Sequence, residues 1–154
     1  MNALSKTVSI DLQPREYGIH TLDSGYMRPR LDAIHLIEHQ GRAVFIDTGT
    51  GHSVPLMLAA LEHLGLGVEA VDYVILTHVH LDHAGGAGLL MQSLPEARLV
   101  VHPRGAPHMI DPGKLWAATV AVYGEARARD DYGTLIPVPA ARVVHYCGGS
   151  GPVP

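Results

Sequence analysis

Three histidines and one aspartate occur within six positions, directly after an apolar run. The segment "LTHVHLDHAGG" spans residues 76–86 and contains His78, His80, Asp82 and His83. Imidazole is the commonest protein ligand for zinc, and a carboxylate adds neutralising charge. His78 and His80 are two residues apart, so both rings point to the same side of an extended segment, whereas Asp82 and His83 are adjacent and point elsewhere. The spacing therefore predicts a loop that offers two ligands to one metal ion and two to a second.

The elements around this loop predict an α/β fold. Apolar runs bounded by Gly, Pro or Asp indicate strands, and apolar residues at helical spacing indicate helices. Ser53 is a candidate N-cap, Gly65 a helix stop, and Gln40-Gly41 a tight hairpin connection. The predicted order is strands at 17–25, 31–39 and 42–49, a helix at 53–64, a strand at 72–77, a helix at 84–93, a strand at 97–102, a helix at 111–129, and an edge strand within 134–146.

The loop falls where α/β proteins usually bind ligands. It follows the carboxyl end of the run "DYVILT" at 72–77, which is apolar enough to be a central, fully buried strand. Loops at that edge are free to carry chemistry while the strands hold them in place. One alternative is that the cluster only caps the helix that follows. Asp82 could do this alone, but three histidines, which cap poorly, are then unexplained.

Composition excludes several classes of protein. The chain has 154 residues, 47% hydrophobic and 17% charged, with a net charge of −4. This is a globular composition of single-domain size, and it lacks the basic stripe of a nucleic-acid binder. No window is apolar enough for a membrane helix or a signal peptide. With one cysteine, Cys147, the chain cannot form an internal disulfide. These features predict a cytoplasmic protein with no nucleic-acid or membrane partner.

The pattern His-x-His-x-Asp-His after an apolar strand resembles the signature of the metallo-β-lactamase fold superfamily. "VFIDTGTG", with Asp47 at its strand end, resembles the Asp-Thr-Gly turn of the same superfamily. The resemblance covers about residues 15–105 and implies an αββα sandwich. It also implies that His78 and His80 bind a first metal ion and that Asp82 and His83 bind a second.

This resemblance implies hydrolysis of an ester, thioester or lactone-type small molecule. Two zinc ions, or iron or manganese, would activate a shared water, and Asp82 would orient this nucleophile as well as ligate. Asp47 would support the loop from behind the ligands. Two alternatives are an iron-dependent oxidoreductase of the persulfide dioxygenase-like kind on the same fold, and a non-catalytic half-domain. Redox relatives tend to replace the second histidine of the motif with a carboxylate, so His80 favours hydrolysis.

The second half of the superfamily pattern is missing from this sequence. The family completes each metal site with two further histidines and a bridging aspartate, and only His102 and His145 are weak candidates here. We therefore expect the N-terminal half of the sandwich over residues 1–146, followed by an unstructured tail at 147–154. This half would be a truncated version of a longer hydrolase with reduced activity. It would leave one apolar sheet face open, and the chain would self-associate through that face.

Overall fold

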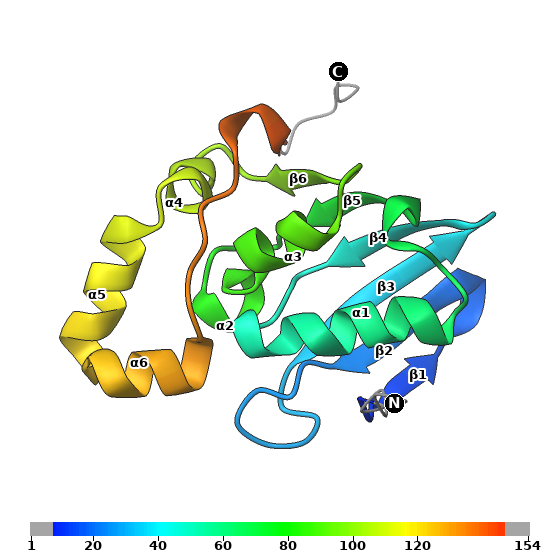
Figure 1. Cartoon of the computed structure of the whole chain (residues 1–154), viewed down its shortest axis with the longest axis horizontal. Helices are drawn as coiled ribbons and strands as arrows, with labels where there is room; N and C mark the ends of the chain where they lie inside the picture. The colour runs from blue at the N-terminus through cyan, green and yellow to red at the C-terminus, as the bar shows by residue number, and fades with distance from the viewer. Residues whose placement is uncertain (1–7, 147–154) are drawn as a thin grey trace, which may run out of the picture.

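In the described part of the chain, a single mixed sheet of seven strands runs through the molecule, and the strands lie side by side in their order along the chain; Figure 1 labels β1 to β6. The computed structural model describes residues 8–146. The first four strands are antiparallel and the last four are parallel, with the fourth shared by both groups. The strands are β1 (Leu12–Pro14), β2 (Ile19–Asp23), β3 (Ala33–His39), β4 (Arg42–Ile46), β5 (Val71–Ile75), β6 (Arg98–Val101) and β7 (Val143–His145).

Along the chain, every α-helix falls in a connection between two parallel strands, as the α/β prediction requires. They are α1 (Val54–His63), α2 (Leu81–Ala84), α3 (Ala87–Ser93), α4 (Ala106–Ile110), α5 (Gly113–Tyr123) and α6 (Glu125–Tyr132). The strand "DYVILT" is central, since β5 pairs with β4 on one side and β6 on the other. β7 is an edge strand, as its neighbouring prolines predict. The tail predicted at 147–154 lies outside the described residues.

The hairpin between β3 and β4 forms at the predicted connection. Gln40 and Gly41 both have positive φ, at 50° and 77°, as the two central residues of a type I′ turn require. This turn sets a register in which His35 pairs with Ile46. The start of β3 therefore lies beside the end of β4, where Asp47 begins the Asp-Thr-Gly turn.

Local differences from the predicted helices have simple causes. Ser53 precedes α1, but its hydroxyl donates to the Ser24 carbonyl at 2.6 Å and does not cap the helix. Thr50 caps the preceding 3₁₀ turn, and Gly65, at φ 70°, follows the end of α1 as expected. The helix predicted at 111–129 is two helices, because Gly124 adopts φ 79° and breaks it.

Alternate residues along the strands divide the sheet into a buried face and an open face. The buried face packs against α1 and α3 and includes Leu36, Phe45 and Leu99, all fully buried. The open face is apolar but only half-buried by the described part of the chain, and Tyr73 is 43% exposed there. Its other apolar members are Ile19, Ile37, Val44, Ile46, Ile75, Val100 and Val144.

This open face predicts concentration-dependent self-association, because apolar patches of this kind mark interaction surfaces. We expect two copies of the chain to pair through it. Val44→Lys places a charge at its centre and should keep the protein monomeric at concentrations where the unmodified chain associates. Sedimentation velocity is the measurement, and Glu62→Lys, exposed on α1, is the matched control. Identical sedimentation of the Val44→Lys and unmodified chains would exclude this interface.

Arg142 fastens the segment before β7 to the end of α3. Its guanidinium donates to the carbonyl oxygens of Met91 at 2.7 Å and Ala97 at 2.6 Å, and also to that of Leu94. Carbonyl groups at a helix end need such partners.

Arg142→Ala should therefore lower the free energy of unfolding by about 2–3 kcal/mol, since hydrogen bonds to a charged group are lost together. Urea denaturation measures this, and Arg142→Lys, which keeps the charge without the planar fork, should lie between the two. A change below about 0.5 kcal/mol for Arg142→Ala would mean that these bonds contribute no more than an ordinary surface residue.

No helix among residues 8–146 is long and apolar enough to cross a membrane.

Candidate metal site

The predicted ligands lie together in the loop and short helix that follow β5. We call residues 77–83 the motif loop. The ring of His78 lies 4.7 Å from that of His80 and 4.2 Å from that of His83, measured between centroids. The three imidazoles therefore form one cluster. Within it, the ring nearer to His78 is that of His83 and not that of His80. Asp82 adjoins this cluster, with its Oδ2 3.5 Å from His83 Nε2.

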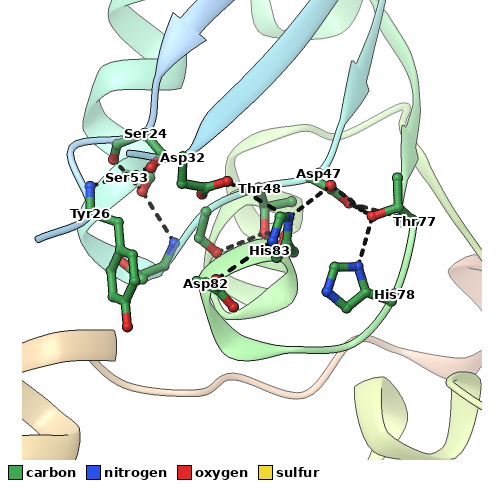
Figure 2. Close-up of polar contacts among 12 residues, drawn as sticks. Ser24, Tyr26, Asp32, Asp47, Thr48, Ser53, Thr77, His78, Asp82 and His83 are labelled. Carbon is green, nitrogen blue, oxygen red and sulfur yellow. Dashed lines mark hydrogen bonds and ion pairs between the residues drawn. The ribbon is translucent and has the colours of Figure 1, made fainter. Parts of the chain in front are cut away.

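Asp47 lies behind the motif loop and holds it through several bonds (Figure 2). Its Oδ1 accepts the Thr77 backbone N–H at 2.8 Å, and its Oδ2 accepts the Thr77 hydroxyl at 2.8 Å. His83 Nδ1 lies 3.0 Å from the same Oδ2. The carboxylate is buried, and φ at Asp47 is 61°, a region that Asp tolerates better than most residues. Asp47 is thus positioned for the predicted supporting role, since it bonds Thr77 of the motif loop and His83, a candidate metal ligand.

These bonds fix the proton positions on two of the rings. A carboxylate can only accept, so His83 Nδ1 must carry the hydrogen that faces Asp47. The Thr77 hydroxyl has a single hydrogen, which it gives to Asp47, so it must accept from His78 Nδ1 at 2.9 Å. In the neutral rings, the Nε2 atoms of His78 and His83 therefore present lone pairs. This is the form in which imidazole binds metal, with the other nitrogen donating to an outer partner.

The site fits a cation by its chemistry. His83 Nε2 and Asp82 Oδ2 face each other at 3.5 Å, and with His83 neutral both are acceptors. Two facing lone pairs repel each other, and a metal cation bound between them would remove this repulsion. Within the described residues, however, no three His, Cys, Asp or Glu side chains are already arranged to hold a metal ion. Binding would need rotation of side chains such as those of His78 and His80, both of which are exposed.

A second carboxylate, Asp32, approaches His83 from the start of β3. Its Oδ1 lies 3.8 Å from His83 Nδ1, and its Oδ2 is buried with no hydrogen-bond partner in the described part of the chain. Burial raises the pKa of Asp32, and the His83 imidazole opposes this. Sequence reasoning missed this residue. The hairpin register could have indicated it, because continuing the pairing of His35 with Ile46 places residue 32 beside the Asp-Thr-Gly turn.

Backbone hydrogen bonds join the Asp-Thr-Gly turn to the motif loop. The Thr48 N–H donates to the His83 carbonyl at 2.7 Å, and the Gly86 N–H donates to the Gly49 carbonyl at 3.0 Å. At Gly86 the two segments approach so closely that a Cβ atom would lie 2.6 Å from the Thr50 carbonyl oxygen. Gly86 thus permits the contact that places the predicted ligands above Asp47.

The two weaker ligand candidates have different positions. His102 follows β6 and lines a cavity together with His78, so it lies at the same edge of the sheet. His145 is exposed on β7. The structure adds three tyrosines that sequence reasoning did not select. Tyr26, Tyr123 and Tyr132 line a second cavity, beside His80 and Asp82. They come from distant segments, so no local pattern could have grouped them.

The fold and the site together define a known class. The model of the metallo-beta-lactamase superfamily matches residues 28–153. The chain therefore belongs to the metallo-β-lactamase superfamily, as the motif predicts.

Curated relatives include hydroxyacylglutathione hydrolases from Salmonella. That of Salmonella paratyphi A is 31% identical over 121 residues, which cover 76% of this chain and 42% of the relative. That of Salmonella dublin is 30% identical over the same length. The chain thus spans less than half the length of these relatives.

Solved structures show the same fold. An archaeal metallo-beta-lactamase superfamily protein from Sulfolobus tokodaii matches with a TM-score of 0.65 and 25% identity, covering 84% of this chain and 48% of that one. A metallo-beta-lactamase from Legionella gormanii matches with a TM-score of 0.59 and 20% identity, covering 83% of this chain and 44% of that one. These matches agree with the predicted half of a sandwich.

Proposed function

We propose that this chain carries the metal-binding half of a hydrolase that cleaves an ester, thioester or lactone-type small molecule. The observation that carries the proposal is the imidazole cluster held above Asp47, in which His78 and His83 present Nε2 lone pairs. A thioester is the first substrate class to test, because the Salmonella relatives are named as hydroxyacylglutathione hydrolases.

In this proposal His78, His80, Asp82 and His83 would hold two zinc ions, or iron or manganese ions in their place. Zinc, when bound, supplies Lewis acidity that polarises a carbonyl group and lowers the pKa of water. Asp82 would orient the nucleophile as well as ligate, because its carboxylate adjoins the ring cluster. Asp47 keeps His83 in the tautomer that ligates and fixes Thr77, which in turn fixes His78.

We also propose that the reaction takes place in the cytoplasm, because a chain with a single cysteine fits a reducing compartment. The proposed partners are a small-molecule substrate and a second copy of the chain, with no nucleic acid and no membrane. The net charge of −4 agrees with the absence of a nucleic-acid partner.

The test is thiol release from a hydroxyacylglutathione by protein expressed with added zinc. We expect zinc-dependent turnover that chelation removes and that Asp82→Asn abolishes, at a rate below that of full-length relatives. Asp130→Asn, exposed on α6, removes a carboxylate away from the site and should leave turnover unchanged. Stoichiometric iron with oxygen uptake would replace hydrolysis with the redox alternative. If Asp82→Asn keeps both its bound zinc and its turnover, the role assigned to Asp82 is contradicted.

A further inference from the structure

Two cavities adjoin the motif loop, and each is lined by different residues of it. The first, which we call the tyrosine cleft, has a volume of about 390 Å³ and is lined by His80 and Asp82 of the loop. The second, which we call the basic cavity, has a volume of about 330 Å³ and is lined by Thr77 and His78. Both volumes are in the range of small-molecule sites. A molecule bound over the imidazole cluster can therefore extend into both.

Among residues 8–146, the lining of the basic cavity carries cationic and hydrogen-bond-donating groups and no carboxylate. Arg104, His102 and His108 line it beside His78, with an apolar floor that includes Val101. The Arg104 backbone N–H donates to His102 Nδ1 at 3.1 Å, so in the neutral ring His102 Nε2 carries the hydrogen and can donate. A guanidinium beside such a donor matches the two oxygens of a carboxylate or the oxygens of a phosphate.

The tyrosine cleft has the opposite character. Within the described residues it has no Lys or Arg in its lining, and apart from His80, Asp82 and Thr119 that lining is tyrosine and leucine. Tyr26 and Tyr132 stack with centroids 5.9 Å apart and rings inclined by 24°. The Tyr26 and Tyr132 hydroxyls are hydrogen-bonded at 3.2 Å, which uses one of their two hydrogens and leaves the other free to donate to a ligand. Burial raises the pKa of Tyr132, which keeps this group neutral.

We propose that the substrate spans the motif loop, with an anionic oxygen group in the basic cavity and a neutral apolar or aromatic group in the tyrosine cleft. The scissile carbonyl then lies between them, over the imidazole cluster. The inference rests on the proposed function, and it specifies the substrate as a small ester or thioester with one charged and one apolar end.

The test uses ligand binding, which needs no turnover. Butyrate and inorganic phosphate probe the basic cavity, and benzyl alcohol probes the tyrosine cleft, with the metal-free full chain followed by ¹H–¹⁵N NMR. Butyrate should shift amides of residues 102–108, and Arg104→Gln should weaken its binding about tenfold through loss of a charge-assisted bond. Arg98→Gln, exposed at the opposite end of β6, is the matched control and should bind butyrate like the unmodified chain.

Benzyl alcohol should shift amides of α5 and α6, and Tyr123→Ala should weaken its binding while leaving butyrate binding unchanged. Tyr123 is 49% exposed, so this variant should fold. 4-Phenylbutyrate, which joins the two probes, should bind at least about 100-fold more tightly than either because its second contact is intramolecular. Phosphate binding in place of butyrate supports the same anionic subsite and identifies the group as a phosphate.

Three results would overturn the inference: anion binding unaffected by Arg104→Gln, both probes shifting the same residues, or no gain in affinity for 4-phenylbutyrate. Failure of hydrolysis with both probes bound as expected would instead refute the proposed function. The two outcomes are therefore distinguishable.

Discussion

Replacement of His80 with alanine is expected to weaken zinc binding at least about 100-fold, because losing only the outer partner of a ligand already costs about 10–100-fold. His80 is exposed in the motif loop and lies outside the hydrophobic core. The free energy of unfolding of the metal-free protein should therefore change by less than about 0.5 kcal/mol. Isothermal titration calorimetry with zinc and urea denaturation measure the two quantities.

His63→Ala serves as the control, since His63 is an exposed histidine at the end of α1, away from the motif loop. It should bind zinc like the unmodified chain. A His80→Ala protein that is unstable without metal, or that binds zinc normally, would show that the assignment of His80 as a ligand is wrong.

Asp47→Ala is expected to have two effects, because this carboxylate holds both a backbone amide and a candidate ligand. Zinc affinity should fall about 10–100-fold as His83 and Thr77 lose the partner that orients them. Stability should also fall by about 2–4 kcal/mol, since Thr77 and His83 lose their hydrogen bonds to Asp47 and alanine is unfavourable at φ 61°. Zinc titration and urea denaturation measure these effects.

Asp47→Asn separates the two effects. Asparagine keeps the size of the side chain and tolerates positive φ, so most of the stability should return. It removes the charge that faces His83, so zinc affinity should stay reduced. Unchanged zinc affinity in both variants would exclude a supporting role for Asp47 in metal binding.

Much of the fold could be predicted because its signals are local. The Gln40-Gly41 turn, the apolar run of β5 and the prolines before β7 each determine a feature within a few residues. The break at Gly124 could not be predicted, since a glycine inside an apolar helical pattern is compatible with a continuous helix as well. The bounds of β2, β3 and β4 also depend on pairing partners that the sequence does not specify.

The candidate site divides in the same way. The position of His78, His80, Asp82 and His83 at the end of a central strand followed from their spacing. The close approach of His83 to His78 did not, because ring orientation depends on Asp47 and Thr77, which lie on two different strand ends. Asp32 and the tyrosine cleft required the tertiary structure, since their members are brought together only when the sheet forms and α5 and α6 take their places in the fold.

The hydrogen bonds between the Asp-Thr-Gly turn and the motif loop have a thermodynamic consequence. The Thr48 and Gly86 amides are already paired across the two segments without any ion, so the loop loses its backbone entropy when the chain folds. Small zinc proteins differ, because they fold only when the ion binds, and the free energy of metal binding then offsets the entropy lost on folding. Zinc binding here should therefore show a heat-capacity change near zero, and deuterium exchange at these two amides should be slow with or without the ion.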